Sequence, residues 1–136
     1  MFYLPFQKRL PLNKYQTMQY LLPHAELDLY FRDGQFALDT QKQLAKDFAQ
    51  FHLYFEDNFT TEPLHLQRIQ AAIAELLIEL IKEGETRLLQ LLYTIDLPEK
   101  EFLHLTTEPQ FLQLISERIL LREAYKVFLR RKFSAY

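Results

Sequence analysis

The sequence contains no cysteine and no tryptophan, and only 2 of its 136 residues are glycine. The lack of cysteine excludes disulfide frameworks, thiolate nucleophiles and cysteine-ligated zinc or iron–sulfur sites, and it is typical of a reducing cytoplasm. The scarcity of glycine argues against the many tight turns of a sandwich or barrel and against glycine-rich phosphate loops. These absences favour a helical protein without the common cofactor-binding motifs.

Long apolar runs are also missing. The densest apolar stretch, at residues 76–81, is interrupted by Glu79, whereas a bilayer-spanning helix needs about 18 apolar residues in a row. The N-terminus places Lys8 and Arg9 after its apolar residues, which reverses the order of a secretory signal, and Pro5 interrupts it. We therefore expect a soluble, cytoplasmic protein with no membrane segment.

The composition is that of a folded domain. Hydrophobic residues make up 49% of the chain and charged residues 25%, and the length suits one domain with a continuous core. Leu, Gln, Glu and Lys are abundant, as in helical proteins. We predict a mainly α, single-domain irregular bundle of four or five helices over residues 1–136, with a less regular N-terminal segment at 1–38 and a helical core at 39–136.

The N-terminal segment allows two interpretations. Its prolines break any long helix, although a short one over about 14–22 is compatible with the pattern. Within residues 26–38, apolar and polar residues alternate on both sides of Asp33-Gly34, which is the signature of a short β-hairpin. The alternative is a loop that leads into the next helix.

Helical periodicity begins after this segment. Apolar residues at 44, 48, 51 and 55 predict a helix capped near Asp39 or Thr40, although its end, beyond Phe51, also fits an extended strand. The tetrapeptide TTEP occurs at 60–63 and again at 106–109. Since proline suits the first position of a helix, we interpret both copies as helix starts, and favour repeated start signals over an internal duplication.

The remaining boundaries follow from local signals. Gly84 is expected to end the helix that starts at Pro63, as a left-handed C-terminal cap. A shorter helix follows from Glu85, and the last helix, 109–133, is the longest. The C-terminal half of the helix that starts at Pro63 is apolar on more than one face. This pattern predicts a homodimer with Leu77 and Ile81 in its interface. The alternative is a monomer that buries both residues.

Two Glu-x-x-His motifs, Glu62/His65 and Glu101/His104, are the only metal-site pattern that we recognise. Di-iron helical proteins combine two such motifs with two further glutamates. Glu62 lies before a proline at a helix start, so capping is the favoured interpretation, and a metal-dependent enzyme is the minor alternative. The four histidines are scattered and no catalytic motif is present, so we predict a non-enzymatic protein with no cofactor. Further carboxylates that could complete a di-iron site are Glu75, Glu79, Glu117 and Glu123.

The last helix carries a basic stripe, which we define as Arg118, Arg122, Lys126 and Arg130. These residues recur every four positions, and residues 109–136 contain six Lys/Arg against two Asp/Glu. We predict an interaction or regulatory protein that acts through its helical surfaces, with the stripe as partner-binding residues and Arg122 and Lys126 as the exposed pair to test. A nucleic-acid-binding protein that uses the stripe on phosphates is the alternative.

Residues 91–99 (LLYTIDLPE) and 122–127 (REAYKV) resemble segments of a small family of uncharacterised bacterial helical proteins. The resemblance covers about residues 60–133 and implies a helical fold and a bacterial cytoplasm, without an activity or cofactor. It also implies that Leu92 and Ile95 belong to the core, that Asp96 is a cap, and that Arg122 and Glu123 are partners of the turn.

Overall fold

A computed structural model describes residues 21–134, apart from the side chain of His24. The possible helix at 14–22 lies almost wholly outside this range. The described residues form α1 (His24–Phe31), α2 (Gly34–Ala49), α3 (Leu66–Lys82), α4 (Glu85–Thr94) and α5 (Phe111–Phe133). Three short 3-10 helices lie in the connections: η1 (Asp57–Thr60), η2 (Glu99–Glu101) and η3 (Leu103–Leu105). The predicted mainly α bundle is confirmed, and no strand occurs within residues 21–134.

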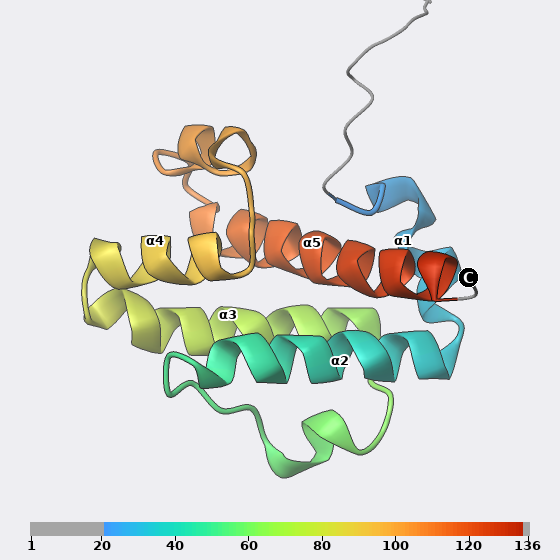
Figure 1. Ribbon diagram of the computed structural model, residues 1–136. Helices are drawn as coiled ribbons and strands as arrows, with labels where there is room; N and C mark the ends of the chain where they lie inside the picture. Colours follow the sequence, from blue (N-terminus) through green and yellow to red (C-terminus); the bar gives the residue numbers. More distant parts are fainter. Residues whose placement is uncertain (1–20, 135–136) are drawn as a thin grey trace, which may run out of the picture.

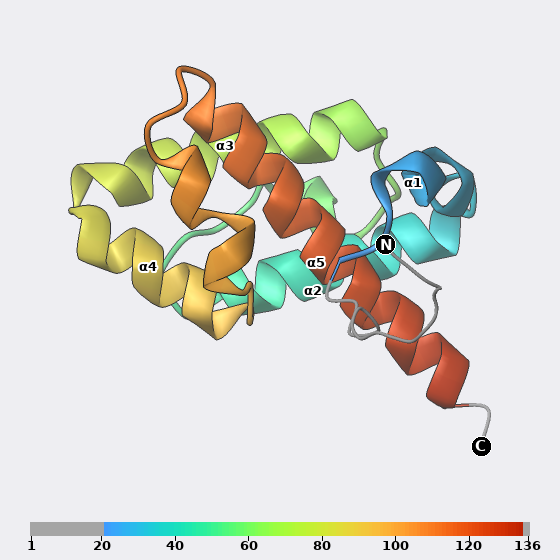
Figure 2. The same cartoon turned by 90° about the horizontal axis from the view of Figure 1, so that it is seen from above.

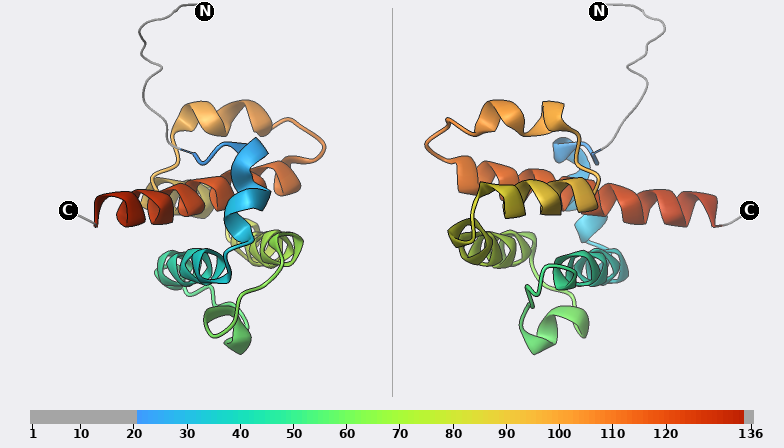
Figure 3. Two further views of the ribbon diagram at one scale, coloured as in Figure 1. Left: turned by 90° about the vertical axis from the view of Figure 1, so that its right-hand side faces the viewer. Right: turned by 60° about the vertical axis from the view of Figure 1, so that its left-hand side comes forward.

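The longest helix, α5, organises the molecule. Figure 1 shows α2 and α3 below α5, and Figure 2 shows α5 crossing above them, with one of the two helices on each side. The end views in Figure 3 place α2 and α3 in one layer. Helix α4 packs against α3, and α1 packs against α2. No helix in the described part of the chain has both the length and the apolarity that crossing a bilayer requires.

One apolar core joins these layers, and both α3 and α5 contribute to it. Helix α3 buries apolar residues at 69, 73, 77 and 80, and α5 does so at 115, 119, 124 and 127, among other positions. The spacing in α3 keeps its buried side chains on one side of the helix, whereas α5 buries every residue from 119 to 124 and is therefore covered on all sides at its middle. The buried side chains of both helices belong to one continuous cluster with those of α2 and α4.

The hairpin interpretation of residues 26–38 is wrong, because these residues belong to α1 and α2. Asp33 is the N-cap of α2, and its Oδ1 accepts hydrogen bonds from the backbone N–H of Gln35 (2.9 Å) and Phe36 (3.4 Å). Aspartate favours helix N-caps as well as turns, and here the cap prevails. The predicted cap residues Asp39 and Thr40 therefore lie inside α2, where the Thr40 hydroxyl donates to the Phe36 carbonyl.

The predicted helix starts at Pro63 and Pro109 are early. Helix α3 begins at Leu66 and α5 begins at Phe111. A buried side chain explains the first difference: Gln41 Nε2 donates to the carbonyl oxygens of Phe59 (2.7 Å) and Glu62 (2.9 Å), and Gln41 Oε1 accepts from Leu64 N–H (2.9 Å). These bonds tie the segment around Pro63 to α2 and keep it out of the helix.

Gly84 separates α3 from α4, as predicted, but in a different conformation. Its φ of 116° and ψ of 158° lie in the mirror image of the extended region rather than in the left-handed helical region. Only glycine adopts this region readily. Only Glu83 and Gly84 lie between α3 and α4, which pack against each other.

Candidate functional site

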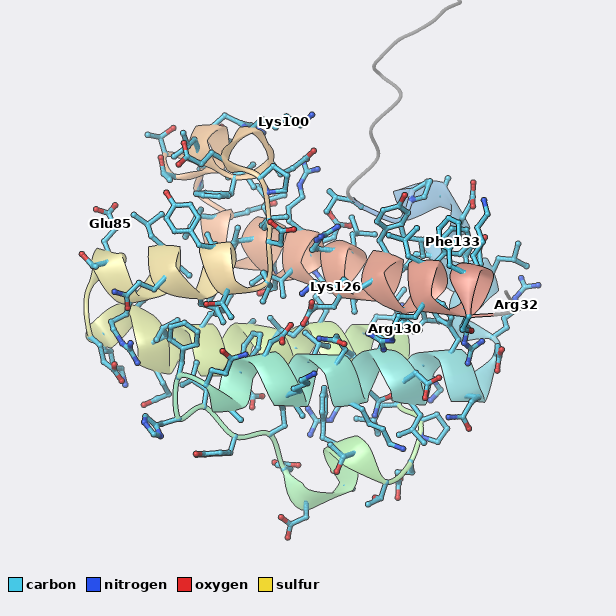
Figure 4. All side chains as sticks on the ribbon, viewed as in Figure 1. Arg32, Glu85, Lys100, Lys126, Arg130 and Phe133 are labelled. Atoms are coloured by element: carbon cyan, nitrogen blue, oxygen red, sulfur yellow. The ribbon has the colours of Figure 1, made fainter. Side chains whose placement is uncertain are left out.

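The basic stripe faces other parts of the chain over most of its length. Arg118 Nη1 lies 3.5 Å from Glu101 Oε1, at the edge of η2. Further along α5, Lys126 and Arg130 point toward α2, as Figure 4 shows. Lys126 contacts two carboxylates, and Arg130 donates from Nη1 to Gln43 Oε1 at 2.6 Å. The stripe is thus mainly a row of intramolecular contacts.

Arg122 is buried, so its interpretation as an exposed residue is wrong. Only 8% of the residue is exposed, and its Nε donates to the Ile95 carbonyl at 3.3 Å. Its Nη2 donates to Asp96 Oδ2 at 3.0 Å. Arg122 therefore binds the turn after α4, as the sequence resemblance implies, and the implied core residues Leu92 and Ile95 are fully buried.

Asp96 caps the C-terminal end of α4. It has a φ of 66°, and its backbone N–H donates to the Tyr93 carbonyl, while that of Leu97 donates to the Leu92 carbonyl. These two bonds form a Schellman motif, in which the left-handed position usually holds glycine. Aspartate tolerates this conformation better than most residues do. Arg122 adds a third donor to the carbonyls at this helix end.

A cluster of charged side chains joins α2 to α5, and we call Asp47, Glu123 and Lys126 the buried ionic cluster. Lys126 Nζ lies 3.0 Å from Asp47 Oδ2 and 2.7 Å from Glu123 Oε1. Glu123 is completely buried, and the Asp47 side chain is 8% exposed. Although Lys126 is close, neither carboxyl oxygen of Glu123 accepts a well-directed hydrogen bond from the described residues.

A proton on Glu123 would balance the charges of this cluster. Burial raises the pKa of Glu123 well above its usual range, and the neighbouring Asp47 raises it further against the opposing effect of Lys126. Burial would also raise the pKa of Asp47, but hydrogen bonds from Glu123 and Lys126 outweigh it and hold this pKa below its usual value. A neutral Glu123 beside the Asp47 carboxylate and the Lys126 ammonium would leave the cluster without net charge. Because Glu123 is inaccessible, the cluster is a structural contact rather than a catalytic site.

The structure separates the two predicted interface residues. Leu77 is fully buried in the core, whereas Ile81 is 39% exposed on the last turn of α3. Leu77 therefore cannot contribute to an oligomer interface on the surface of this fold, and the prediction for Leu77 is wrong. Self-association itself stays a prediction.

The Glu-x-x-His motifs do not meet as the metal-site interpretation requires. His65 is the N-cap of α3, and His104 lies in η3. Within residues 21–134, no group of three or more His, Asp or Glu side chains is arranged to hold a metal ion. The motif residues are mostly on the surface, and Glu101 pairs with Arg118.

An apolar hollow lies between α1 and the C-terminal half of α5, and we call it the α1–α5 hollow. Its volume is about 400 Å³. Aromatic rings form its wall, with Tyr30 edge-on to Phe128 at 5.6 Å between ring centroids and Tyr30 also 5.4 Å from Phe36. Leu29, which is 62% exposed, stands at its edge. Asp33, Arg131 and Lys132 complete the rim.

Arg131 fixes one side of this hollow. Its Nη1 and Nη2 lie 3.0 Å from Asp33 Oδ2 and 3.1 Å from Asp39 Oδ2, and its guanidinium carbon lies 5.2 Å from the Phe36 ring centroid. The hydrogen bond from Arg131 lowers the pKa of Asp33 below its usual value. The N-cap of α2 is thereby tied to the end of α5.

Sequence reasoning did not identify the hollow or Asp47. A local signal exists for Asp47, because it lies three residues after Leu44 and next to Phe48, on the buried face of α2. A carboxylate at such a position indicates a buried partner elsewhere in the chain. The sequence carries no comparable signal for the hollow, since it requires α1 to lie against α5.

A comparison with protein-family models, curated proteins and solved structures gives no match to this sequence.

Proposed function

We propose that this chain is a non-enzymatic protein-interaction module, and that a segment of a partner protein docks in the α1–α5 hollow. The exposed apolar surface at the hollow carries this proposal. Leu29, which lines the hollow at its edge, is 62% exposed. Apolar surface bordered by charged groups is typical of protein–protein contact sites.

The rim indicates the chemistry of the partner. Lys132 Nζ lies 5.9 Å and 6.0 Å from the ring centroids of Phe128 and Phe133, and it pairs with no carboxylate within residues 21–134. A short amphipathic helix with an apolar anchor would fill the hollow, and an Asp or Glu one turn away would pair with Lys132. An acidic amphipathic segment is therefore the expected partner.

The alternative of nucleic-acid binding through the basic stripe has less support. Arg118, Arg122 and Lys126 have intramolecular acidic or carbonyl partners, so they would have to exchange those partners for phosphates. The formal net charge of the chain is −2, which also opposes long-range attraction of nucleic acid. Purified chain should accordingly show no excess absorbance at 260 nm.

A selection from a displayed peptide library tests the docking site, with the full chain as target. We expect enriched peptides to carry one or two large apolar residues beside Asp or Glu. Their affinity should fall at least about tenfold for Leu29→Asp. The matched control is Leu103→Asp, because Leu103 is similarly exposed (52%) but lies in η3, and this variant should bind normally.

Three outcomes would contradict the partner site. Peptides that bind wild type and Leu29→Asp equally would place the contact elsewhere. Light scattering that shows a dimer, which Leu29→Asp converts to a monomer, would assign the hollow to a second copy of the chain. Crosslinks within one monomer from Lys132 to Lys8 or Lys14 would assign it to the N-terminal residues of the chain itself.

A further inference from the structure

A second depression, which we call the α2–α5 groove, lies between α2 and the end of α5. It has a volume of about 310 Å³ and contains no residue of the α1–α5 hollow. Lys42 and Lys46 stand one helical turn apart on α2, so they border the same side of the groove. Arg130 faces them from α5, where Figure 4 labels it. Three cationic side chains therefore surround one space. Asp39 and Gln43 complete the lining.

The acidic and amide groups of the groove are already engaged. Asp39 accepts hydrogen bonds from Arg131 Nη2 at 3.1 Å and from Gln35 Nε2 at 2.8 Å. Gln43 accepts from Arg130 and donates to Asp47 at 3.1 Å. Within the described part of the chain, the three cations of the groove form no ion pair with a carboxylate. The groove thus holds an excess of positive charge.

Helix position explains only part of this excess. Lys46 and Arg130 lie in the last turns of α2 and α5, where cations interact favourably with the helix dipole. Lys42 lies in the middle of α2, where it gains nothing from the dipole, and like charges four residues apart destabilise a helix. We infer that the α2–α5 groove binds the phosphate group of a small phosphate monoester through Lys42, Lys46 and Arg130.

The lining matches this ligand class. A phosphate monoester carries nearly two negative charges near neutral pH and offers three acceptor oxygens. Arg130 uses only Nη1 in its bond to Gln43, so Nε and Nη2 can donate to a phosphate, and the two lysines add point charges. Among residues 21–134 no aromatic side chain lines the groove, so a nucleobase would find no stacking partner there in this part of the chain. The recognised part is therefore the phosphate group alone.

The test is a two-dimensional NMR titration of the full chain, with inorganic phosphate and phenyl phosphate as probes at constant ionic strength. We expect saturable shifts centred on residues 42–46 and at Arg130. The double variant Lys42→Gln/Lys46→Gln should weaken binding at least about tenfold. The control Lys82→Gln/Arg87→Gln removes the same charge from exposed ion pairs on α3 and α4 and should leave binding unchanged.

Three results would overturn the site. Shifts that grow linearly without saturation would show nonspecific ion association. Equal binding by the groove variant and wild type would place the phosphate elsewhere. If a single-stranded oligonucleotide binds in a salt-dependent way while phosphate and phenyl phosphate do not, the groove contacts a nucleic-acid backbone instead.

Discussion

Glu123 is the residue whose surroundings conflict most with its charge. Its pKa lies above the usual value of a glutamate, so over a range of pH the folded chain holds a proton that the unfolded chain has released. Within that range, the free energy of unfolding falls as the pH rises. Asp47 acts in the opposite sense, because its lowered pKa makes the folded chain lose stability as the pH falls through the acidic range below its usual pKa.

The variant Glu123→Gln should remove the loss of stability at high pH. The amide resembles the protonated acid, since it can donate to Asp47 and accept from Lys126. We measure the free energy of unfolding in urea from about pH 5 to about pH 9. At the acidic end the variant and wild type should have similar free energies of unfolding, and toward the alkaline end the variant should become increasingly more stable than wild type. Glu79→Gln, in an exposed pair with Lys82, is the control and should follow the wild-type slope. A constant difference between Glu123→Gln and wild type would show that Glu123 is ionised throughout.

At the scale of a helix end, the contributions of two Arg122 contacts, to the Ile95 carbonyl and to Asp96, can be compared. Asp96 is 81% exposed, and an ion pair with so exposed a carboxylate adds less than about 1 kcal/mol. Loss of the buried bond to the Ile95 carbonyl leaves an unsatisfied acceptor and should cost about 1 to 3 kcal/mol. We therefore expect Arg122→Met to lower the free energy of unfolding more than Asp96→Asn does in chemical denaturation. Equal losses would mean that the ion pair, not the carbonyl, is the main interaction.

The connection between α3 and α4 depends on one glycine. An alanine at position 84 meets no atom within 4 Å, so any effect of Gly84→Ala comes from the backbone conformation. We expect a loss of about 1 to 3 kcal/mol in thermal or chemical unfolding. Gly34→Ala is the matched control, because Gly34 is helical and the added Cβ would touch Pro63 at an ordinary 3.4 Å. It should be neutral or stabilising by up to about 1 kcal/mol, and a comparable loss at both positions would contradict backbone strain at Gly84.

Local patterns predict elements well where the signal and the contact lie close together in the sequence. The glycine between α3 and α4 and the length of α5 could both be read this way. The start of α3 could not, because Gln41 acts on residues 18 to 23 positions away. Asp33-Gly34 was ambiguous for a different reason, since the same pair suits a hairpin and a helix N-terminus.

The candidate sites required the whole fold. Lys126 lies 79 positions from Asp47, and Arg131 lies 98 positions from Asp33. A sequence pattern shows that α5 is basic, but only the packing of α5 on α1 and α2 shows which cations are neutralised. Arg118, Arg122 and Lys126 are used inside the molecule, whereas Arg130 and Lys132 have no carboxylate partner within residues 21–134. The sequence thus predicts a charged helix, and the packing of the fold determines which of its cationic side chains can still bind a ligand.

At the scale of the whole molecule, α1 should open before the rest. Of its described side chains only Leu27 is buried, whereas α3 and α5 bury many. Helix α1 is held to α5 by the contact between the rings of Tyr30 and Phe128. Just before α1, the hydrogen bond from Leu22 N–H to the Leu121 carbonyl adds a second link to α5. Few buried contacts imply a low free energy of local opening.

Native-state hydrogen exchange measured by mass spectrometry checks this order. Amides of residues 26–31 should exchange at least about tenfold faster than those of residues 70–80, and with a weaker dependence on denaturant. If both segments instead exchange with one free energy and one denaturant slope, α1 belongs to the global unfolding unit. A library-selected peptide should slow exchange in α1 of wild type but not of Leu29→Asp, because the α1–α5 hollow exists only while α1 is docked.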